Sequence, residues 1–251
     1  MSELIFLGTG AAVPDKEHHN THLVFRNRSG AVLVDCGSSP TIRLEEAGIG
    51  LDEVSDIILT HFHPDHVGSL PLLLMNMWLV GRQNTLRIYG LHHCLERVES
   101  VMSFYQWENW PEFFPVAFHR LPELQRGLIL ELGDLKVYAS TVRHVIPTIG
   151  LRFEVNNGER VLAYSCDSEP CPEVVHLAEG AEILIHEATG EEVGHSSARQ
   201  AGEIAAQSGV QALYLVHYPT IGVTKRELLD GAGQSFSGKV VVAEDFDRLI
   251  I

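Results

Sequence analysis

The sequence predicts an α/β protein in which two stacked β-sheets are flanked by layers of helices. Three observations support this fold class. Short apolar segments recur between turn residues, as the strands of a sheet do. Stretches of helical composition separate several of these segments. Two strand-rich halves are each followed by helices, which is typical of sheets that pack face to face and are covered on their outer sides.

The elements of the first half are predicted from apolar or alternating segments that are bounded by turn residues such as Gly8, Asn27 and Gly30. We expect strands over 3–7, 22–26, 31–34, 56–59 and 86–89. We expect helices over 40–47, 68–77 and 92–103. One buried strand therefore ends directly before a cluster of histidines that begins at His61.

The second half opens with a meander of strands. We expect these over 128–132, 136–141, 150–155 and 160–164, with tight turns at Gly133–Asp134 and Asn157–Gly158. The pattern then becomes strand, helix, strand over 183–185, 197–208 and 212–216. Because the chain has no fixed-period repeat, low-complexity tract or linker, we expect one domain over residues 1–251.

The aromatic segment Met102–Phe118 fits neither pattern. It concentrates Tyr105, Trp107, Trp110 and four phenylalanines. Such a segment can form a wall or lid over an active site, a subunit interface, or part of the core. The sequence leaves these three alternatives open, and a homodimer with them.

Composition restricts the partners of this chain. It has 33 Asp and Glu against 18 Lys and Arg, a net charge of -15, and therefore repels long nucleic acid and anionic lipid. The longest apolar stretch, 67–80, contains Pro71 and Asn76 and is shorter than the ~20 residues of a membrane span. The N-terminus has no secretory signal pattern, which favours a cytoplasmic protein without a membrane partner. We expect its four cysteines to be free thiols.

A dense cluster of metal-binding side chains follows the strand at 56–59. His61, His63, Asp65 and His66 lie within six residues. Imidazole nitrogen and carboxylate oxygen are ligands that zinc accepts at roughly 2.0–2.2 Å, and manganese or iron accepts the same set. His61 and His63 can share one metal while Asp65 and His66 serve a second, so we expect two divalent ions, Zn²⁺ first among them.

The segment HFHPDHVG resembles the HxHxDH signature of the metallo-beta-lactamase superfamily. Seven further segments resemble the ribonuclease Z branch of that superfamily and occur in its order: FLGTGAAVP, VLVDCGSS, VRHVIPTIGLRF, YSCDS, IHEAT, HSSARQA and LVHYP. The likeness extends over nearly the whole chain. It implies a four-layer αββα sandwich and a metal-dependent hydrolase that resembles a phosphodiesterase or nuclease.

The resemblance also implies a set of metal ligands. Carried over position by position, it assigns one metal to His61, His63 and His144, a second metal to Asp65, His66 and His217, and a bridge between them to Asp167. Read from the residues alone, His144, Asp167 and His217 each follow a predicted strand. A hydroxide that bridges the two metals would be the nucleophile, and Asp65 can orient it. Such a centre attracts an anionic substrate even in an acidic protein.

The pair Glu187 and His195 is characteristic of the ribonuclease Z-like branch. The resemblance implies that Glu187 orients His195, which protonates the departing alkoxide. Asp35 resembles a structural aspartate of the family and is not expected to be a catalyst. His186 is expected on the side of its strand opposite to Glu187. Seven histidines have no motif around them and are expected to be surface or structural residues: His18, His19, His22, His92, His93, His119 and His176.

Three features depart from the ribonuclease Z pattern. Pro64 stands where HxHGDH has glycine, which stiffens the loop. Because 22 residues separate His144 from Asp167, no transfer-RNA-binding arm fits there. His217 is followed by Tyr218–Ile221 and not by the arginine-containing segment of the family. A compact anionic phosphodiester, such as a cyclic nucleotide or a short oligonucleotide, is therefore favoured over the 3′ processing of precursor transfer RNA.

Two other functions stay open at this point. The same fold and metals can hydrolyse a carboxylic substrate such as a thioester or a lactone, whose leaving group needs an acid less than a ribose oxygen does. A metal-binding scaffold or sensor without enzymatic activity would leave no position open for water. The candidate acid at His195 favours an enzyme that acts on a poor leaving group.

Overall fold

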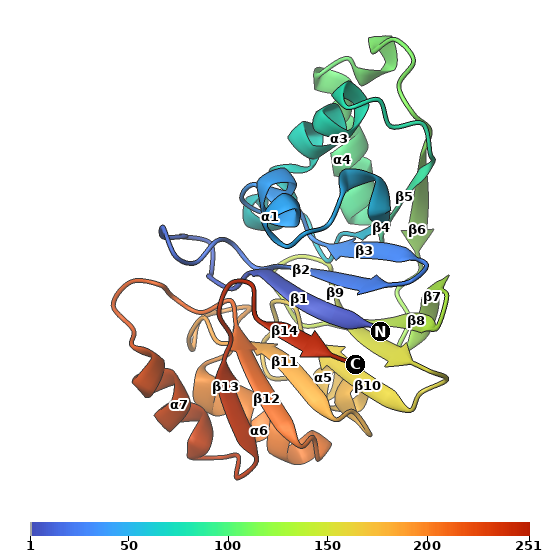
Figure 1. The fold of residues 1–251 in the computed structure, drawn as a ribbon. Coiled ribbons are helices and arrows are strands. Elements are labelled where there is room, and N and C mark those ends of the chain that lie inside the picture. Colours follow the sequence, from blue (N-terminus) through green and yellow to red (C-terminus); the bar gives the residue numbers. More distant parts are fainter. Residues whose placement is uncertain (1) are drawn as a thin grey trace.

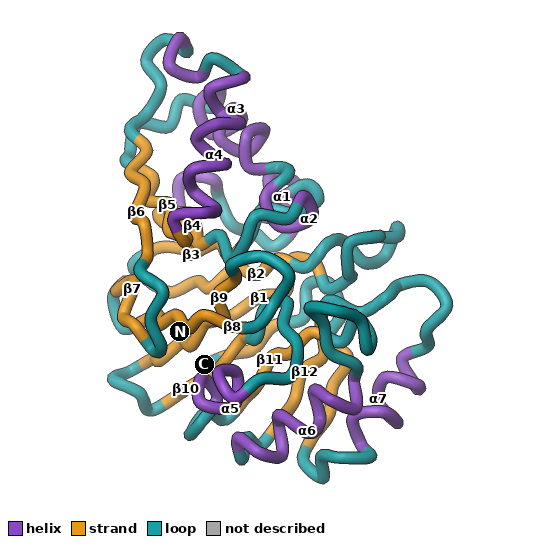
Figure 2. The backbone as a smooth tube through the Cα atoms, turned by 180° about the vertical axis from the view of Figure 1, so that it is seen from behind, coloured by secondary structure: helices purple, strands orange, loops and turns teal. Residues whose placement is uncertain are grey.

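The computed structural model describes residues 2–251, which form two seven-stranded sheets that lie face to face (Figure 1). The first sheet has the order β14-β1-β2-β3-β4-β5-β6. Its strands are β1 (Glu3–Gly8), β2 (His22–Asn27), β3 (Gly30–Val34), β4 (Val54–Ile58), β5 (Leu86–Leu91), β6 (Val116–Leu121) and β14 (Arg248–Ile250). Its outer face is covered by helices α1 (Pro40–Glu46), α3 (Leu70–Leu79) and α4 (His92–Phe104) (Figures 1 and 2).

The second sheet has the order β13-β12-β11-β10-β9-β8-β7. Its strands are β7 (Gly127–Leu132), β8 (Leu135–Val142), β9 (Thr148–Val155), β10 (Arg160–Tyr164), β11 (Ile183–Glu187), β12 (Ala212–Val216) and β13 (Lys239–Val242). Its outer face is covered by helices α5 (Pro172–Ala178), α6 (Ala198–Ser208) and α7 (Lys225–Gly233) (Figures 1 and 2). The predicted four-layer αββα order is thereby confirmed.

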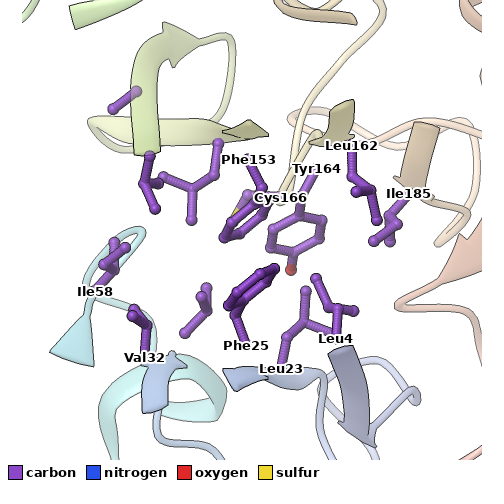
Figure 3. Packing of buried hydrophobic residues seen from close by; sticks show 14 of the residues in the cluster. Leu4, Leu23, Phe25, Val32, Ile58, Phe153, Leu162, Tyr164, Cys166 and Ile185 are labelled. Atoms are coloured by element: carbon purple, nitrogen blue, oxygen red, sulfur yellow. The ribbon is translucent and has the colours of Figure 1, made fainter. Parts of the chain in front are cut away.

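A buried hydrophobic cluster fills the space between the two sheets. Phe25 on β2 stacks on Phe153 of β9, with ring centroids 6.1 Å apart. Figure 3 shows Leu4 of the first sheet facing Leu162 and Tyr164 of the second. Fully burying an apolar side chain of this size contributes roughly 1.5–3 kcal/mol. The contacts between the sheets therefore fix how the two halves of the molecule face each other.

The helix expected over 68–77 is present with its bounds shifted by two residues, and a further short helix that was not expected precedes it. A short helix, α2 (Pro64–Val67), is followed by α3, which begins at Leu70. Proline lacks a backbone N–H and is favoured in the first turn of a helix, so Pro64 and Pro71 each mark a helix start. The elements β6, α5, α7, β13 and β14 were not predicted from the sequence.

The loops that carry candidate site residues gather along one edge of the sandwich. Strands β3, β4, β5 and β6 run parallel in the first sheet, and β10, β11, β12 and β13 run parallel in the second. Parallel strands end at a common edge, and ligands of α/β proteins bind outside those carboxyl ends. The loops after β4, β10, β11 and β12 are therefore neighbours although they are far apart in the sequence.

Two smaller expectations concern the connections and the cysteines. Strands β9 and β10 are joined by a short turn in which Asn156, Asn157 and Gly158 have φ of 52°, 58° and 88°. The four cysteines are free and buried, as expected: Cys36, Cys94, Cys166 and Cys171. Within residues 2–251, no helix combines the length and apolarity needed to cross a membrane.

Candidate metal centre

Three histidines form the first of two adjacent clusters. His61 and His63 lie in the loop between β4 and α2, and His144 follows β8. Nε2 of His61 is 3.0 Å from Nδ1 of His63, and Nε2 of His144 is 3.2 Å from that same Nδ1. One ring nitrogen from each imidazole therefore meets the other two at one place.

The second cluster lies beside the first. Asp65 and His66 belong to α2, and His217 follows β12. Nε2 of His217 is 3.4 Å from Nε2 of His66 and 3.3 Å from Oδ2 of Asp65. Asp167, after β10, stands between the clusters, because its Oδ2 is 3.8 Å from Nε2 of His61 and 3.4 Å from Nε2 of His66. The structure thus brings together all seven residues that the resemblance assigned to metals.

The positions of these atoms fit divalent ions. Ligands held ~2.05 Å from a tetrahedral metal lie about 3.3 Å from one another, and the separations above run from 3.0 to 3.8 Å. The second carboxylate oxygen of Asp167, Oδ1, is buried and has no hydrogen-bond partner in residues 2–251. Five imidazoles and two carboxylates are a set that zinc, manganese or iron accepts.

Protein groups hold the outward nitrogen of four of the five imidazoles. In each case Nδ1 contacts an oxygen atom and Nε2 is left for the cluster. The pairs are His61 with the Thr60 hydroxyl (3.1 Å), His66 with Asp35 (2.9 Å), His144 with the Gly194 carbonyl (2.7 Å) and His217 with the Thr189 hydroxyl (2.9 Å). An Nδ1–H that donates to such an oxygen fixes the tautomer and the ring orientation that present Nε2 to a metal.

Asp35 supports the centre without belonging to either cluster. Its carboxylate accepts the backbone N–H of Thr60 at 2.8 Å as well as Nδ1 of His66. Asp35, Cys166 and His217 have φ of 64°, 53° and 48°. A residue other than glycine costs of order 1 kcal/mol or more in this region of φ, and such residues concentrate at functional sites. Of these three residues, His217 is itself a candidate ligand, and Asp35 and Cys166 lie next to candidate ligands. Asp35 thus has the structural position that was expected.

Electrostatics keep the carboxylates ionised. Burial would raise the pKa of Asp167, but the nearby charges of His217 and His66 hold it well below its ordinary value. Burial also tends to raise the pKa of Asp65, and the hydrogen bond from His217 lowers it. Burial lowers the pKa of His61 well below its ordinary value, which leaves the neutral imidazole that binds metals.

Glu187 and His195 form a buried pair beside the clusters. Glu187 ends β11 and accepts Nδ1–H of His195 at 2.9 Å. It also accepts the backbone N–H groups of Thr189, Ser168 and Ser196 at 2.9, 3.0 and 3.2 Å. Burial would lower the pKa of His195, but its hydrogen bond to Glu187 and the charge of Glu187 raise it. The arrangement favours the protonated form of His195 and leaves Nε2 free of Glu187.

A cavity of about 410 Å³ opens at this edge of the sandwich, over the two clusters. His195 is part of its wall, and its ring centroid is 5.0 Å from that of His144 and 5.9 Å from that of His217. Apart from the candidate ligands and His195, Glu192 is the one ionisable residue of the lining, which contains no Lys or Arg from residues 2–251. The remaining lining residues are Ala11, Ala12, Val13, Thr189, Pro219, Thr220 and Ile221.

The aromatic segment 102–118 does not reach this cavity. Trp110 stacks on Trp78 of α3 with ring centroids 5.1 Å apart, and the segment packs against the buried cluster beneath α3 and α4. None of the described residues in the segment lines the cavity. The alternative of a wall or lid over the metal centre of the same chain is therefore wrong. Phe104 and Tyr105 keep 85% and 59% of their surface exposed.

The other histidines lie outside the clusters. His186 is fully buried, and its Nδ1 donates to the carbonyl oxygen of Glu187 at 2.8 Å. The seven histidines without a motif belong to none of the groups in residues 2–251 that could hold a metal. Three supporting residues, Thr60, Thr189 and Gly194, were not identified from the sequence. Thr189 lies in the IHEAT segment, which is a signal for its position, whereas Gly194 has no such signal.

The stacked sheets, the two clusters at their common edge and the Glu187–His195 pair define a metal-dependent hydrolase of the metallo-beta-lactamase superfamily, of the phosphodiesterase or nuclease type. The fold matches the crystal structure of YhfI from Bacillus subtilis with a TM-score of 0.84, 23% identity and coverage of 99% and 98% of the two chains. The chain belongs to the family described as Anti-Pycsar protein Apyc1, whose model matches residues 2–228.

Ribonuclease Z enzymes are relatives of this chain. That of Methanothermobacter thermautotrophicus is 30% identical over an alignment of 296 positions, gaps included, which covers 94% of this chain and 92% of the relative. The crystal structure of human tRNase Z, short form, matches with a TM-score of 0.78 and 24% identity, covering 99% of each chain. The resemblance to the ribonuclease Z branch is thereby confirmed.

Proposed function

We propose that the protein is a dinuclear phosphodiesterase whose substrate is a compact anionic phosphodiester, such as a cyclic nucleotide or a short oligonucleotide. The observation that carries the proposal is His195, which Glu187 holds beside the two clusters. A ribose oxygen is a poor leaving group, and its departure as an alkoxide is helped by a proton donor. The site therefore suits a bond that breaks to an alkoxide.

Seven residues would hold the two metal ions. The first ion is assigned to His61, His63 and His144, the second to Asp65, His66 and His217, and both to Asp167. Bound divalent ions supply a water that is activated near neutral pH and stabilise the negative charge of the phosphoryl group under attack. We infer that the two ions are Zn²⁺, since the usual ligands of zinc are present. Mn²⁺ and Fe ions accept the same donors and are the alternatives.

The catalytic roles fall to three side chains. Asp65 faces the cavity and has one oxygen near His217, so it can orient the attacking water. His195 donates its proton to the leaving oxygen. Glu187 keeps the His195 ring in place and stabilises its charged form, because its carboxylate is fully buried and accepts four hydrogen bonds.

The form of the cavity favours a compact substrate. At about 410 Å³ it falls in the range of small-molecule sites. Its lining offers no Lys or Arg in the described chain, and the protein carries a net charge of -15. Long nucleic acid is bound through rows of basic residues, which this lining does not provide. The short turn between β9 and β10 likewise leaves no arm for transfer RNA.

Metal analysis joined to a substrate panel tests the proposal. The panel contains bis-p-nitrophenyl phosphate, 3′,5′-cyclic nucleotides, dinucleotides, precursor transfer RNA, a thioester and a lactone. We expect about two metals per chain and turnover of phosphodiesters, with the cyclic nucleotides and dinucleotides preferred to transfer RNA. Turnover of the thioester or the lactone alone would instead assign the protein to carboxylic substrates.

The acid role has a separate test. We expect His195→Ala to slow the hydrolysis of a diester with an alkoxide leaving group by roughly 10²–10⁴-fold. The same variant should slow bis-p-nitrophenyl phosphate by less than about tenfold, because p-nitrophenolate leaves without a proton. His176→Ala, which changes an exposed histidine on α5, is the control. Equal slowing of both substrates by His195→Ala would disprove the acid role.

We also infer a homodimer that meets over α3 and the end of α4. This face exposes Leu72, Leu79 and Val80 by 54%, 65% and 66%, together with Phe104 and Tyr105. Exposed apolar surface of this kind commonly marks an interface. Sedimentation should give twice the chain mass, and the double variant Leu79→Glu, Phe104→Glu should give the monomer. An unchanged mass in the double variant would contradict this interface.

Two further inferences complete the assignment. We infer one domain over residues 1–251, because loops from both sheets build a single centre, and limited proteolysis should then release no stable half. A cytoplasmic location stays a prediction, which the four free cysteines support, since cytoplasmic thiols are kept reduced.

A further inference from the structure

The geometry points to Glu169 as a positioning residue that joins the metal centre to the loop carrying His195. We call residues 189–196 the acid loop. Glu169 is half-buried and lies two residues after Asp167, outside both clusters and without contact to the cavity. Its importance for His195 rests on the proposed function, whereas its importance for metal binding does not.

Three hydrogen bonds close a ring around Glu169. Its backbone N–H donates to the carbonyl oxygen of Arg143 at 2.7 Å. Its side-chain Oε1 accepts the backbone N–H of Gly194 at 2.9 Å. The carbonyl oxygen of Gly194 in turn accepts Nδ1–H of His144 at 2.7 Å. Residues 143–144, 169 and 194 come from three segments of the chain, and this ring holds them together.

The middle of the acid loop has one other side-chain anchor, on its exposed side, where Oε1 of Glu191 accepts from Arg199 at 3.1 Å and from the Ser197 hydroxyl at 3.2 Å. Glu187 holds both ends of the loop through the N–H groups of Thr189 and Ser196. Between these ends, residues 191–193 are exposed to solvent, and Val193 keeps 80% of its surface exposed. Glu169 is therefore the carboxylate that reaches the middle of the loop, one residue before His195.

The contact at Gly194 tolerates little movement. Gly194 has φ of +87°, and a Cβ atom there would lie 2.9 Å from Nδ1 of His144. If Gly194 N–H loses its acceptor, a shift of this residue removes the carbonyl that orients His144 and moves His195 at the same time. Outer partners of metal-binding histidines typically change metal affinity 10–100-fold when they are lost. We therefore expect Glu169 to influence both the affinity for the first metal, through His144, and the position of His195.

Variants that separate hydrogen bonding from charge test the inference. Glu169→Gln keeps an oxygen that accepts the Gly194 N–H, while Glu169→Asp keeps the charge but withdraws the oxygen. We expect Glu169→Asp and Glu169→Ala to lower zinc affinity, measured by competition with a chelator, by about tenfold or more. Glu169→Gln should stay within about twofold of the natural chain. Glu45→Gln, the same change on an exposed glutamate of α1, is the control.

A second readout follows the acid. Glu169→Ala and Glu169→Asp should slow a diester with an alkoxide leaving group more than bis-p-nitrophenyl phosphate, and Glu169→Gln should restore the ratio. Natural zinc affinity in Glu169→Ala, with nothing but a lower Tm, would overturn the inference. So would natural affinity in Glu169→Asp together with loss in Glu169→Gln. If Glu169→Ala does not fold, the comparison of Glu169→Asp with Glu169→Gln still tests the inference. Failure of the proposed function appears differently, as absence of phosphodiester turnover in the natural chain.

Discussion

The two sheets contribute to the candidate metal centre in different ways. After β4 of the first sheet, one short stretch supplies His61, His63 and the Asp65–His66 pair. The second sheet supplies one residue at the end of each of several strands, as with Asp167 after β10 and His217 after β12. The first group is placed by its local chain, whereas the second is placed by the order of the strands.

The supporting contacts differ in the same way. In the first sheet, Asp35 accepts both Thr60 N–H and His66 Nδ1, so one buried carboxylate organises the whole loop. In the second sheet, Thr189 and Gly194 each support a single histidine from a loop whose middle, residues 191–193, is exposed. The ligands after β4 therefore depend mainly on one supporting residue, Asp35, whereas the ligands of the second sheet depend on several.

The largest expected effect comes from the residue that joins the two regions. Asp167→Ala should lower phosphodiester turnover by about 10³-fold or more, equivalent to about 4 kcal/mol of transition-state stabilisation. It should also reduce the metal content below two per chain, because Oδ2 lies near both clusters. Metal analysis and initial rates measure both outcomes. Asp230→Ala, on the exposed surface of α7, is the control, and a full metal content in the Asp167 variant would contradict the bridge.

The next effect concerns the packing that makes the two regions meet. Phe153→Ala should lower the free energy of unfolding by about 3–5 kcal/mol, since Phe153 is fully buried against Phe25 of the other sheet. Urea unfolding measures this loss. Leu128→Ala, at a side chain that is 50% exposed on β7, should change the free energy by less than about 1 kcal/mol. Equal losses in the two variants would mean that the contacts between the sheets do not control stability.

A third prediction compares the supports of the two regions directly. Asp35→Asn should lower zinc affinity about 10–100-fold, because Nδ1 of His66 loses a charged acceptor. Thr189→Val should lower it by about tenfold at most, since Nδ1 of His217 loses a neutral acceptor. Chelator competition gives both values. A larger loss of zinc affinity in Thr189→Val than in Asp35→Asn would contradict this prediction.

The smallest effect concerns charge at the mouth of the cavity. Glu192 repels substrates that carry a second phosphate, so Glu192→Lys should improve the rate on a 5′-phosphorylated dinucleotide over the unphosphorylated one by about threefold to tenfold at low salt. The gain should fade as salt is added. Glu191→Lys makes the same charge change outside the lining. Equal gains from both variants would show a general effect of charge.

The cluster at 61–66 could be recognised from its residue types alone, because three histidines and an aspartate lie within six residues. His144, Asp167 and His217 were assigned through the resemblance to the ribonuclease Z branch, and their places after predicted strands agree with that assignment. The four-layer fold follows from the same alternation of strands and helices. Strands β1 to β5 were predicted to within two residues, because turn residues bound these segments.

The remaining features depend on backbone positions that residue types do not specify. The part played by Glu169 rests on the N–H of Gly194, which lies 25 positions away and becomes a donor through its place in the loop. The short strands β13 and β14 form because they pair with neighbouring strands, β13 with β12 and β14 with β1. The aromatic segment was ambiguous since the same side chains can build a lid, an interface or a core. In the structure Trp110 stacks on Trp78, whereas Phe104 and Tyr105 stay exposed.

The turn between β9 and β10 offers a labelling position remote from catalysis. Both strands run between this turn and the edge where the metals are proposed to bind, so the turn lies at the opposite end of the second sheet. Asn157 is exposed there, and the four natural thiols are buried. Asn157→Cys would therefore give a single reactive thiol, to which a fluorophore could be attached for binding experiments on the intact enzyme.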